Sequence, residues 1–150
     1  MPLISADDQT FLRDKFAKEL VNTVDIVLFT QGDSPLTVRG QECAYCKETR
    51  QLVEEVSALS DKINLAVRDF VADAEKAKQM GVDKIPAIVL DSGTEERVKY
   101  YGIPSGYEFS SLVEDIIDVS KRSTNLKDNT KQALAQLTKD VHIQVFVTPT

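Results

Sequence analysis

Residues 43–56 read CAYCKETRQLVEEV, and this stretch decides how the rest of the chain is interpreted. Cys43 and Cys46 lie three positions apart, and apolar residues follow at helical spacing from Leu52 onward. Before the pair, the run from Asp25 to Phe29 has the β-branched and aromatic content of a buried strand. The predicted order is therefore strand, loop, cysteine pair and helix.

The 150-residue chain contains two cysteines, which are too close in sequence to join distant elements. A lone structural disulfide is also uncommon in a reducing cytosol, so redox catalysis or metal binding remains. At or near the N-cap of a helix, unpaired N–H groups and the helix dipole favour a thiolate at Cys43. One turn of helix brings Cys46 within disulfide range. We expect Cys43 to be the nucleophile and Cys46 the resolving thiol, with Tyr45 shielding one side.

Zinc binding is the alternative from a different class. A zinc site needs four ligands, whereas the chain offers Cys43, Cys46 and the distant His142. A symmetric pair of chains would have to contribute four cysteines, which would make the protein a zinc-bridged interaction domain. Redox use is favoured, and neither a metal nor a cofactor is expected.

The dipeptide Ile85-Pro86 opens the next apolar run, which reads as a strand up to Leu90. A proline that opens a buried strand lacks a hydrogen-bond donor, so it belongs to an edge or a special turn. Its place between helix and strand, about forty residues after the cysteines, favours a cis bond. The backbone of Ile85 is then expected to face the dithiol and to pair with an extended substrate.

The pattern as a whole predicts an α/β fold with a mixed sheet covered by helices. After an opening helix capped by Ser5, the order is β-α-β-α-β-β-α up to Ser120. A further helix is expected over 125–139 and a strand over 141–147. Because this pair repeats the opening helix and strand, we expect one unit over 1–122 and the start of a second over 123–150, at which the chain stops.

Composition excludes several classes of function. The net charge is −6 and no basic stripe interleaves with aromatic residues, which argues against nucleic acid. No apolar stretch approaches the roughly 18 residues of a membrane helix. The first eight residues show neither a basic nor an apolar region of a secretory signal, so the cytoplasm is the expected compartment.

From Val24 to Ser120 the chain resembles the thioredoxin/glutaredoxin superfamily. The resemblance rests on three segments: Cys43-Ala-Tyr-Cys46, Gly81-Val-Asp-Lys-Ile-Pro86-Ala, and Tyr101-Gly-Ile-Pro-Ser-Gly106. The tyrosine inside the cysteine pair is more typical of glutaredoxins. The run from Tyr107 to Ser120 and the ending Val145-Phe-Val-Thr-Pro-Thr150 further resemble the glutaredoxin-like protein disulfide oxidoreductases, which fuse two thioredoxin-fold units.

The resemblance implies a thioredoxin fold with an extra N-terminal helix and a C-terminal helix-strand extension. It also implies a thiol–disulfide oxidoreductase that reduces, oxidises or isomerises protein disulfides and is served by an upstream reductase. A second relative with this architecture is the electron-transfer module of flavin-dependent peroxiredoxin reductases, which relays electrons instead.

Two features depart from the family pattern. The loop from Gln31 to Glu42 is longer than usual before the dithiol. Thioredoxins also carry a buried acid late in the preceding strand, whereas here Asp25 lies at the wrong end of that strand. Asp69 and Glu42 are candidate substitutes, but each is expected to be an ordinary surface or strand-end acid.

Overall fold

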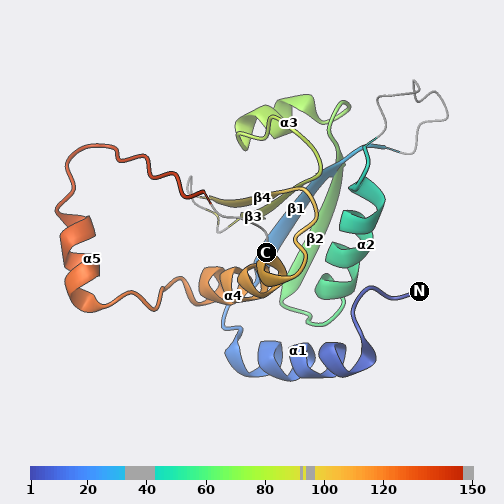
Figure 1. Ribbon diagram of the computed structural model, residues 1–150, viewed down its shortest axis with the longest axis horizontal. Coiled ribbons are helices and arrows are strands. Elements are labelled where there is room, and N and C mark those ends of the chain that lie inside the picture. The colour runs from blue at the N-terminus through green and yellow to red at the C-terminus, as the bar shows by residue number, and fades with distance from the viewer. Residues whose placement is uncertain (33–42, 92, 94–96, 147–150) are drawn as a thin grey trace.

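The computed structural model describes residues 1–32, 43–91, 93 and 97–146 (Figure 1). A mixed four-stranded sheet carries helices on both faces, which confirms the predicted α/β class. The elements are α1 (Ala6–Glu19), β1 (Val24–Thr30), α2 (Cys46–Ser57), β2 (Ile63–Asp69), α3 (Ala74–Gln79), β3 (Ala87–Asp91), β4 (Arg97–Tyr101), α4 (Tyr107–Lys121) and α5 (Asp128–Ala135).

The strand order brings segments that are distant in the sequence to the same end of the sheet. The order is β2-β1-β3-β4, with β1 parallel to β2 and antiparallel to β3. Phe29 pairs with Ala87, and Ala87 pairs with Tyr101 on β4. The residues after β1, before β3 and after β4 therefore meet at the same end of the sheet, which we call the site edge.

Along the two central strands, β1 and β3, successive side chains alternate between two apolar clusters. Ile26, Leu28, Ile88 and Leu90 belong to the larger cluster, which also contains buried residues of α1, α2 and α4. Val27, Phe29, Ala87 and Val89 belong to a smaller cluster with Ala77 and Met80, at α3. Because both faces of β1 and β3 are buried, these strands read in the sequence as nearly continuous apolar runs.

The opening helix begins as its sequence predicts. Ser5 is the N-cap of α1, and its hydroxyl accepts a hydrogen bond from the Asp8 N–H at 3.1 Å. Leu12 and Phe16 are buried, whereas Phe11 is 65% exposed. The apolar arc of the helix is therefore wider than the face that the core covers.

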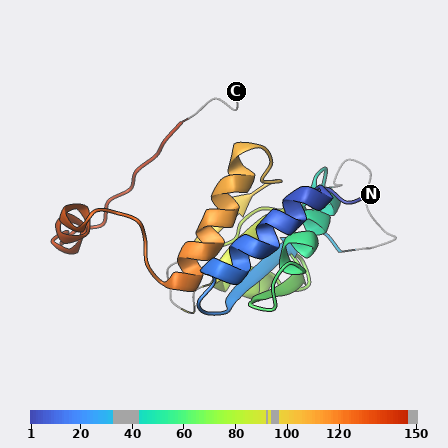
Figure 2. The ribbon, with the colours of Figure 1, turned by 90° about the horizontal axis from the view of Figure 1, so that it is seen from below.

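One later element is shorter than predicted. The helix expected over 125–139 is limited to α5. Residues 121–146 are all exposed, and α5 stands away from the sheet and its covering helices (Figures 1 and 2). No strand is assigned to residues 141–146, because a strand needs a hydrogen-bonded neighbour and this segment lies beside none of the described strands.

Within the described ranges, no helix is both long and apolar enough to cross a bilayer.

Candidate active site

Cys43 and Cys46 form a disulfide at the start of α2, with their Cα atoms 5.5 Å apart. Cys46 is the first residue of the helix, and Tyr45 is its N-cap. Cys43 therefore lies two residues before the cap, slightly further out than the sequence predicts. Cys43 is half-buried and Cys46 is only 6% exposed. The pair thus has one partly exposed and one buried cysteine.

The backbone of the first cysteine is fastened to the end of β1. The N–H of Cys43 donates a 2.7 Å hydrogen bond to Oε1 of Gln31, the first residue after the strand. The loop between Gly32 and Cys43 lies outside the described residues, and so does Glu42. The expected extra length of that loop therefore stays a prediction, whereas the Gln31 side chain connects its two ends.

Asp69 holds the neighbouring strand ends in place. Its carboxylate accepts hydrogen bonds from the N–H groups of Gly32 at 2.6 Å, Val71 at 2.9 Å and Ala72 at 2.7 Å. The bond from Ala72 is the main reason why the pKa of Asp69 lies below its usual value. A Cβ at position 32 would collide with this carboxylate, so any residue other than glycine there would displace the Asp69 side chain. Asp69 therefore remains ionised and ties loops together, as expected of a strand-end acid.

The Ile85–Pro86 peptide bond is cis, as predicted. Pro86 is buried, Ile85 is half-buried, and both precede β3 at the site edge. The carbonyl of Pro86 accepts a hydrogen bond from the N–H of Gly102 at 2.9 Å. The turn after β4 is thereby fixed beside the proline.

A second set of contacts holds the loop before Ile85 against β4. The carbonyl of Gly81 accepts hydrogen bonds from Nζ of Lys99 at 3.1 Å and from the hydroxyl of Tyr101 at 3.3 Å. Lys84 places its ammonium 4.9 Å from the centre of the Tyr101 ring. The loop that carries Ile85 and Pro86 is therefore held against β4 and the turn after it.

Tyr45 is 57% exposed beside the disulfide, so it forms part of the surface that an incoming chain would meet. Two cations, Arg50 and Lys84, have partners of their own. Arg50 forms an ion pair with Glu54 at 2.8 Å, and Lys84 lies over Tyr101. Lys47 is exposed.

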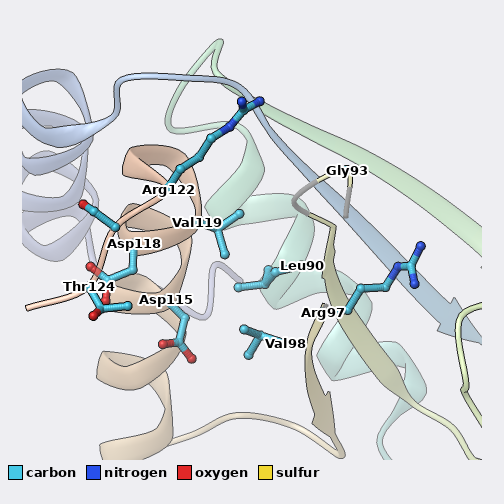
Figure 3. A pocket seen from close by; sticks show the side chains of 10 residues that line it. Leu90, Gly93, Arg97, Val98, Asp115, Asp118, Val119, Arg122 and Thr124 are labelled. Atoms are coloured by element: carbon cyan, nitrogen blue, oxygen red, sulfur yellow. The ribbon is translucent and has the colours of Figure 1, made fainter. Parts of the chain in front are cut away.

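Two of the hollows on the described part of the chain differ in their position relative to the cysteines. One, of about 330 Å³, lies between α2 and the turn after β4, with Leu52, Ile103 and Pro104 among its lining residues. The other, of about 640 Å³, lies between α4 and the opposite ends of β3 and β4. Figure 3 shows Leu90, Val98 and Val119 at its centre. This larger cavity is at the end of the sheet away from the disulfide. Neither Cys43 nor Cys46 lines it.

Comparison with known proteins places this geometry in a family. Residues 35–114, more than half of the chain, match the family model described as a thioredoxin domain. The chain belongs to the thioredoxin domain family. Its cysteine pair at a helix start and its cis proline at the adjoining strand are thus features of a thioredoxin domain, and the resemblance noted from the sequence is confirmed.

Curated relatives are much longer than this thioredoxin domain. The alkyl hydroperoxide reductase protein AhpF of Staphylococcus aureus (strain Mu50 / ATCC 700699) is 28% identical over 104 residues, which are 69% of this chain and 18% of that protein. NADH dehydrogenase of Bacillus subtilis (strain 168) is 24% identical over 120 residues, 80% of this chain and 21% of that protein. The chain therefore spans about a fifth of the length of these relatives.

Solved structures show the same fold. A protein disulfide oxidoreductase from Aeropyrum pernix K1 has a TM-score of 0.73 and 29% identity, covering 89% of this chain and 55% of that one. The alkylhydroperoxide reductase protein AhpF of Enterococcus faecalis (V583) has a TM-score of 0.73 and 23% identity, covering 91% and 62%.

Three further residues around the cysteine pair are not predicted from the sequence. Gln31 and Gly32 contact Cys43 and Asp69, respectively, which are distant in the sequence, so no local pattern predicts these contacts. Thr49, which is fully buried on α2, does leave a signal. It is a polar residue one turn before Leu52 on the otherwise apolar stripe of an amphipathic helix.

Proposed function

We propose that this thioredoxin domain is a thiol–disulfide oxidoreductase that cycles Cys43 and Cys46 between dithiol and disulfide to act on protein disulfides. The observation that carries the proposal is the disulfide at the start of α2, with one half-buried and one buried cysteine. Further support comes from the likeness to the protein disulfide oxidoreductase of Aeropyrum pernix.

In the reducing direction, the Cys43 thiolate attacks one sulfur of a substrate disulfide. A bond forms between Cys43 and that sulfur, and the other substrate sulfur leaves as a thiolate. The Cys46 thiolate then attacks the sulfur of Cys43, which releases the second substrate thiolate and closes the Cys43–Cys46 disulfide. Two electrons have passed to the substrate, and its two thiolates take up the two protons that the dithiol gave up. An upstream reductase restores the dithiol by the reverse exchange.

The assignment of roles follows from exposure. Cys43 is half-buried, and so an incoming disulfide can reach its sulfur, whereas the 6% exposure of Cys46 suits a thiol that attacks only within the mixed disulfide. Tyr45, Ile85 and Pro86 are the proposed substrate-binding residues. Tyr45 would cover one side of the substrate, and the backbone of Ile85 would pair with an extended segment beside Pro86.

A second candidate function is electron relay. It is favoured by the likeness to the alkyl hydroperoxide reductase protein AhpF of Staphylococcus aureus. In this role the same dithiol would take electrons from a reductase and pass them to the disulfide of a peroxiredoxin. The exchange steps at Cys43 and Cys46 are identical, so the two functions differ in the partner alone.

We further propose that residues 1–122 form one functional unit and that 123–150 lead into a second thioredoxin-like unit. Residues 121–146 are exposed throughout, and the apolar side chains of Leu137, Val141 and Ile143 face solvent. Exposed apolar side chains on one segment are typical of a surface that another domain covers.

Trapping of mixed disulfides tests the proposed function. Cys46→Ser should accumulate covalent adducts with a disulfide-containing substrate protein, because the resolving thiol is gone. Cys43→Ser should show neither adducts nor turnover. Adducts are counted by non-reducing electrophoresis and mass spectrometry. Equal residual turnover in the two variants would contradict the assignment of roles.

A further inference from the structure

Thr49 is a polar residue in the apolar stripe of α2. The buried residues of this helix are Cys46, Thr49, Leu52, Val53 and Val56. The side chain of Thr49 has 0% exposure. Its hydroxyl Oγ1 is completely enclosed and has no hydrogen-bond partner in the structure. Buried hydroxyls are nearly always paired, because leaving water without a new partner is unfavourable.

Two other helical hydroxyls, those of Ser57 and Thr10, bond to the carbonyl one turn earlier in their helices. Ser57 on α2 donates to the carbonyl of Val53 at 2.7 Å, and Thr10 on α1 donates to that of Ala6 at 2.9 Å. Thr49 makes no such bond, although its backbone N–H reaches the carbonyl of Tyr45 at 3.0 Å. The unpaired state of its hydroxyl therefore does not follow from helical geometry alone.

The neighbour of Thr49 on the same face is Cys46, three positions earlier. Residues at this spacing are adjacent on a helix surface. Side chains on a helix also lean toward its N-terminus, which brings the Thr49 side chain toward the turn that holds Cys46. The next residues on the buried stripe in the other direction, Leu52 and Val53, have no polar side-chain atoms. Among the residues of this stripe, Cys46 is therefore the helix neighbour toward which Thr49 leans and the one with a sulfur that can accept a hydrogen bond; in the disulfide form the two side chains are not hydrogen-bonded.

The redox state of Cys46 decides whether that partner accepts a hydrogen bond. In the disulfide, the sulfur of Cys46 is bonded to that of Cys43. Two electrons and two protons convert this bond into two thiols. Loss of one proton then gives a monoanion in which the two neighbouring sulfurs share the remaining proton, so Cys46 as well as Cys43 carries negative charge. Sulfur in a disulfide is a weak acceptor, whereas a thiolate is a charged acceptor that forms strong hydrogen bonds.

We propose that Thr49 is a positioning residue that tunes the redox equilibrium by donating a hydrogen bond to the sulfur of Cys46 in the reduced state. The inference rests on the proposed dithiol–disulfide cycle. A hydroxyl that is unpaired in the oxidised form and paired in the reduced form shifts the equilibrium toward the dithiol. It thereby makes the protein a stronger oxidant than the same fold without it.

The test compares the redox midpoints of the whole chain and its variants. Wild type, Thr49→Val and Thr49→Ser are equilibrated with defined ratios of glutathione to glutathione disulfide at one pH. The fraction of Cys43–Cys46 disulfide is then measured by mass after alkylation. Thr49→Val should favour the disulfide about tenfold, the usual worth of one hydrogen bond, which corresponds to about 30 mV for a two-electron couple. Thr49→Ser keeps the hydroxyl and should stay within about twofold of wild type.

A matched control removes a different hydroxyl from the same helix. Ser57→Ala breaks the bond to Val53 far from the cysteines, so it should leave the midpoint unchanged. If Thr49→Val does not fold, Thr49→Ala gives the same comparison. Denaturant unfolding of both redox forms adds a readout, because Thr49→Val should stabilise the oxidised form relative to the reduced one.

The outcomes separate this inference from the proposed function. Equal midpoints in wild type and Thr49→Val would overturn the inference while leaving the redox function intact. An equal change in the stability of both redox forms would overturn it too, because the role of Thr49 would then be structural. A wild-type pair that does not titrate would contradict the proposed function itself, and the inference with it.

Discussion

The side-chain oxygen Oε1 of Gln31 accepts a 2.7 Å hydrogen bond from the backbone N–H of Cys43. The two residues are twelve positions apart, so this bond connects the end of β1 directly to the first cysteine. A nucleophile on a long loop needs such a fastening, because small displacements of a reacting group reduce rates strongly. We therefore regard Gln31 as a positioning residue for Cys43.

Replacing Gln31 should slow disulfide exchange. Gln31→Leu removes the acceptor and should lower the rate of substrate reduction about two- to tenfold, the usual worth of one hydrogen bond. Gln31→Glu keeps an acceptor oxygen and should recover most of that rate. The rate is measured with a fluorescent disulfide-bonded peptide. Equally slow turnover in both variants would show that the hydrogen bond to Cys43 is not what matters.

Ser120 should contribute strongly to stability without affecting the redox site. Its buried hydroxyl accepts hydrogen bonds from the N–H groups of Val21 at 2.9 Å and Asn22 at 3.0 Å, and donates to the carbonyl of Asn22 at 2.6 Å. Ser120→Ala leaves these groups without that partner, so the free energy of unfolding should fall by about 2 kcal/mol. Urea unfolding measures this loss.

The exposed Ser111 on the same helix is the control for that substitution. Ser111→Ala should change the free energy of unfolding by less than about 0.5 kcal/mol. The redox midpoint should be unchanged in both variants, because Ser120 lies at the C-terminal end of α4 beside the α1–β1 connection. A Ser120→Ala protein as stable as wild type would contradict the importance of this network.

Asp69 should make stability depend on pH below neutrality. Hydrogen bonds from backbone N–H groups, above all that of Ala72, hold its pKa in the fold below the usual value of an aspartate. The folded chain therefore binds fewer protons than the unfolded chain near that pKa. The stabilisation is complete above the pKa of the unfolded chain, about 3.9, and is lost as the pH falls through the folded pKa.

The comparison with Asp69→Asn isolates this effect. The free energy of unfolding of wild type should fall more steeply than that of Asp69→Asn between about pH 5 and pH 2. Asp61→Asn, which changes an exposed carboxylate before the other end of β2, should follow the wild-type slope. Parallel curves for wild type and Asp69→Asn would be inconsistent with the lowered pKa.

The exposed C-terminal segment should be dispensable for the fold of the first unit. Residues 121–146 contribute no buried side chain. A chain that ends at Ser123 should therefore unfold within about 0.5 kcal/mol of the full chain, the range of substitutions that touch nothing. Its redox midpoint should also match. A loss of several kcal/mol would show that the segment packs on the domain in solution.

Periodicity in the sequence was sufficient to predict the sheet and its covering helices, because their apolar residues face one shared core. Leu52 and Val56 recur on one face of α2, and the run around Val27 and Phe29 is buried on both sides of the sheet. The cysteine pair was also recognisable, since its spacing carries chemistry. These features are encoded locally, and tertiary packing reinforces them.

Other features depend on what a side chain meets in space. Whether Gln31 bonds to Cys43 depends on how the chain returns after residue 32, and the spacing of residues does not contain that information. The apolar run from Val141 to Val147 favours a strand by composition, yet strand formation also requires a partner strand. No such partner lies beside residues 141–146, and Val147 falls outside the described residues. Local preference and tertiary context disagree there.

A redox titration of the whole chain against defined glutathione ratios, with zinc assayed in the same sample, shows whether the cysteine pair is redox-active. We expect a reversible two-electron transition of Cys43 and Cys46, followed by mass, in protein without stoichiometric metal. The absence of any transition, together with about half a zinc per chain for a four-cysteine site shared by two copies, would show instead that the cysteine pair is structural.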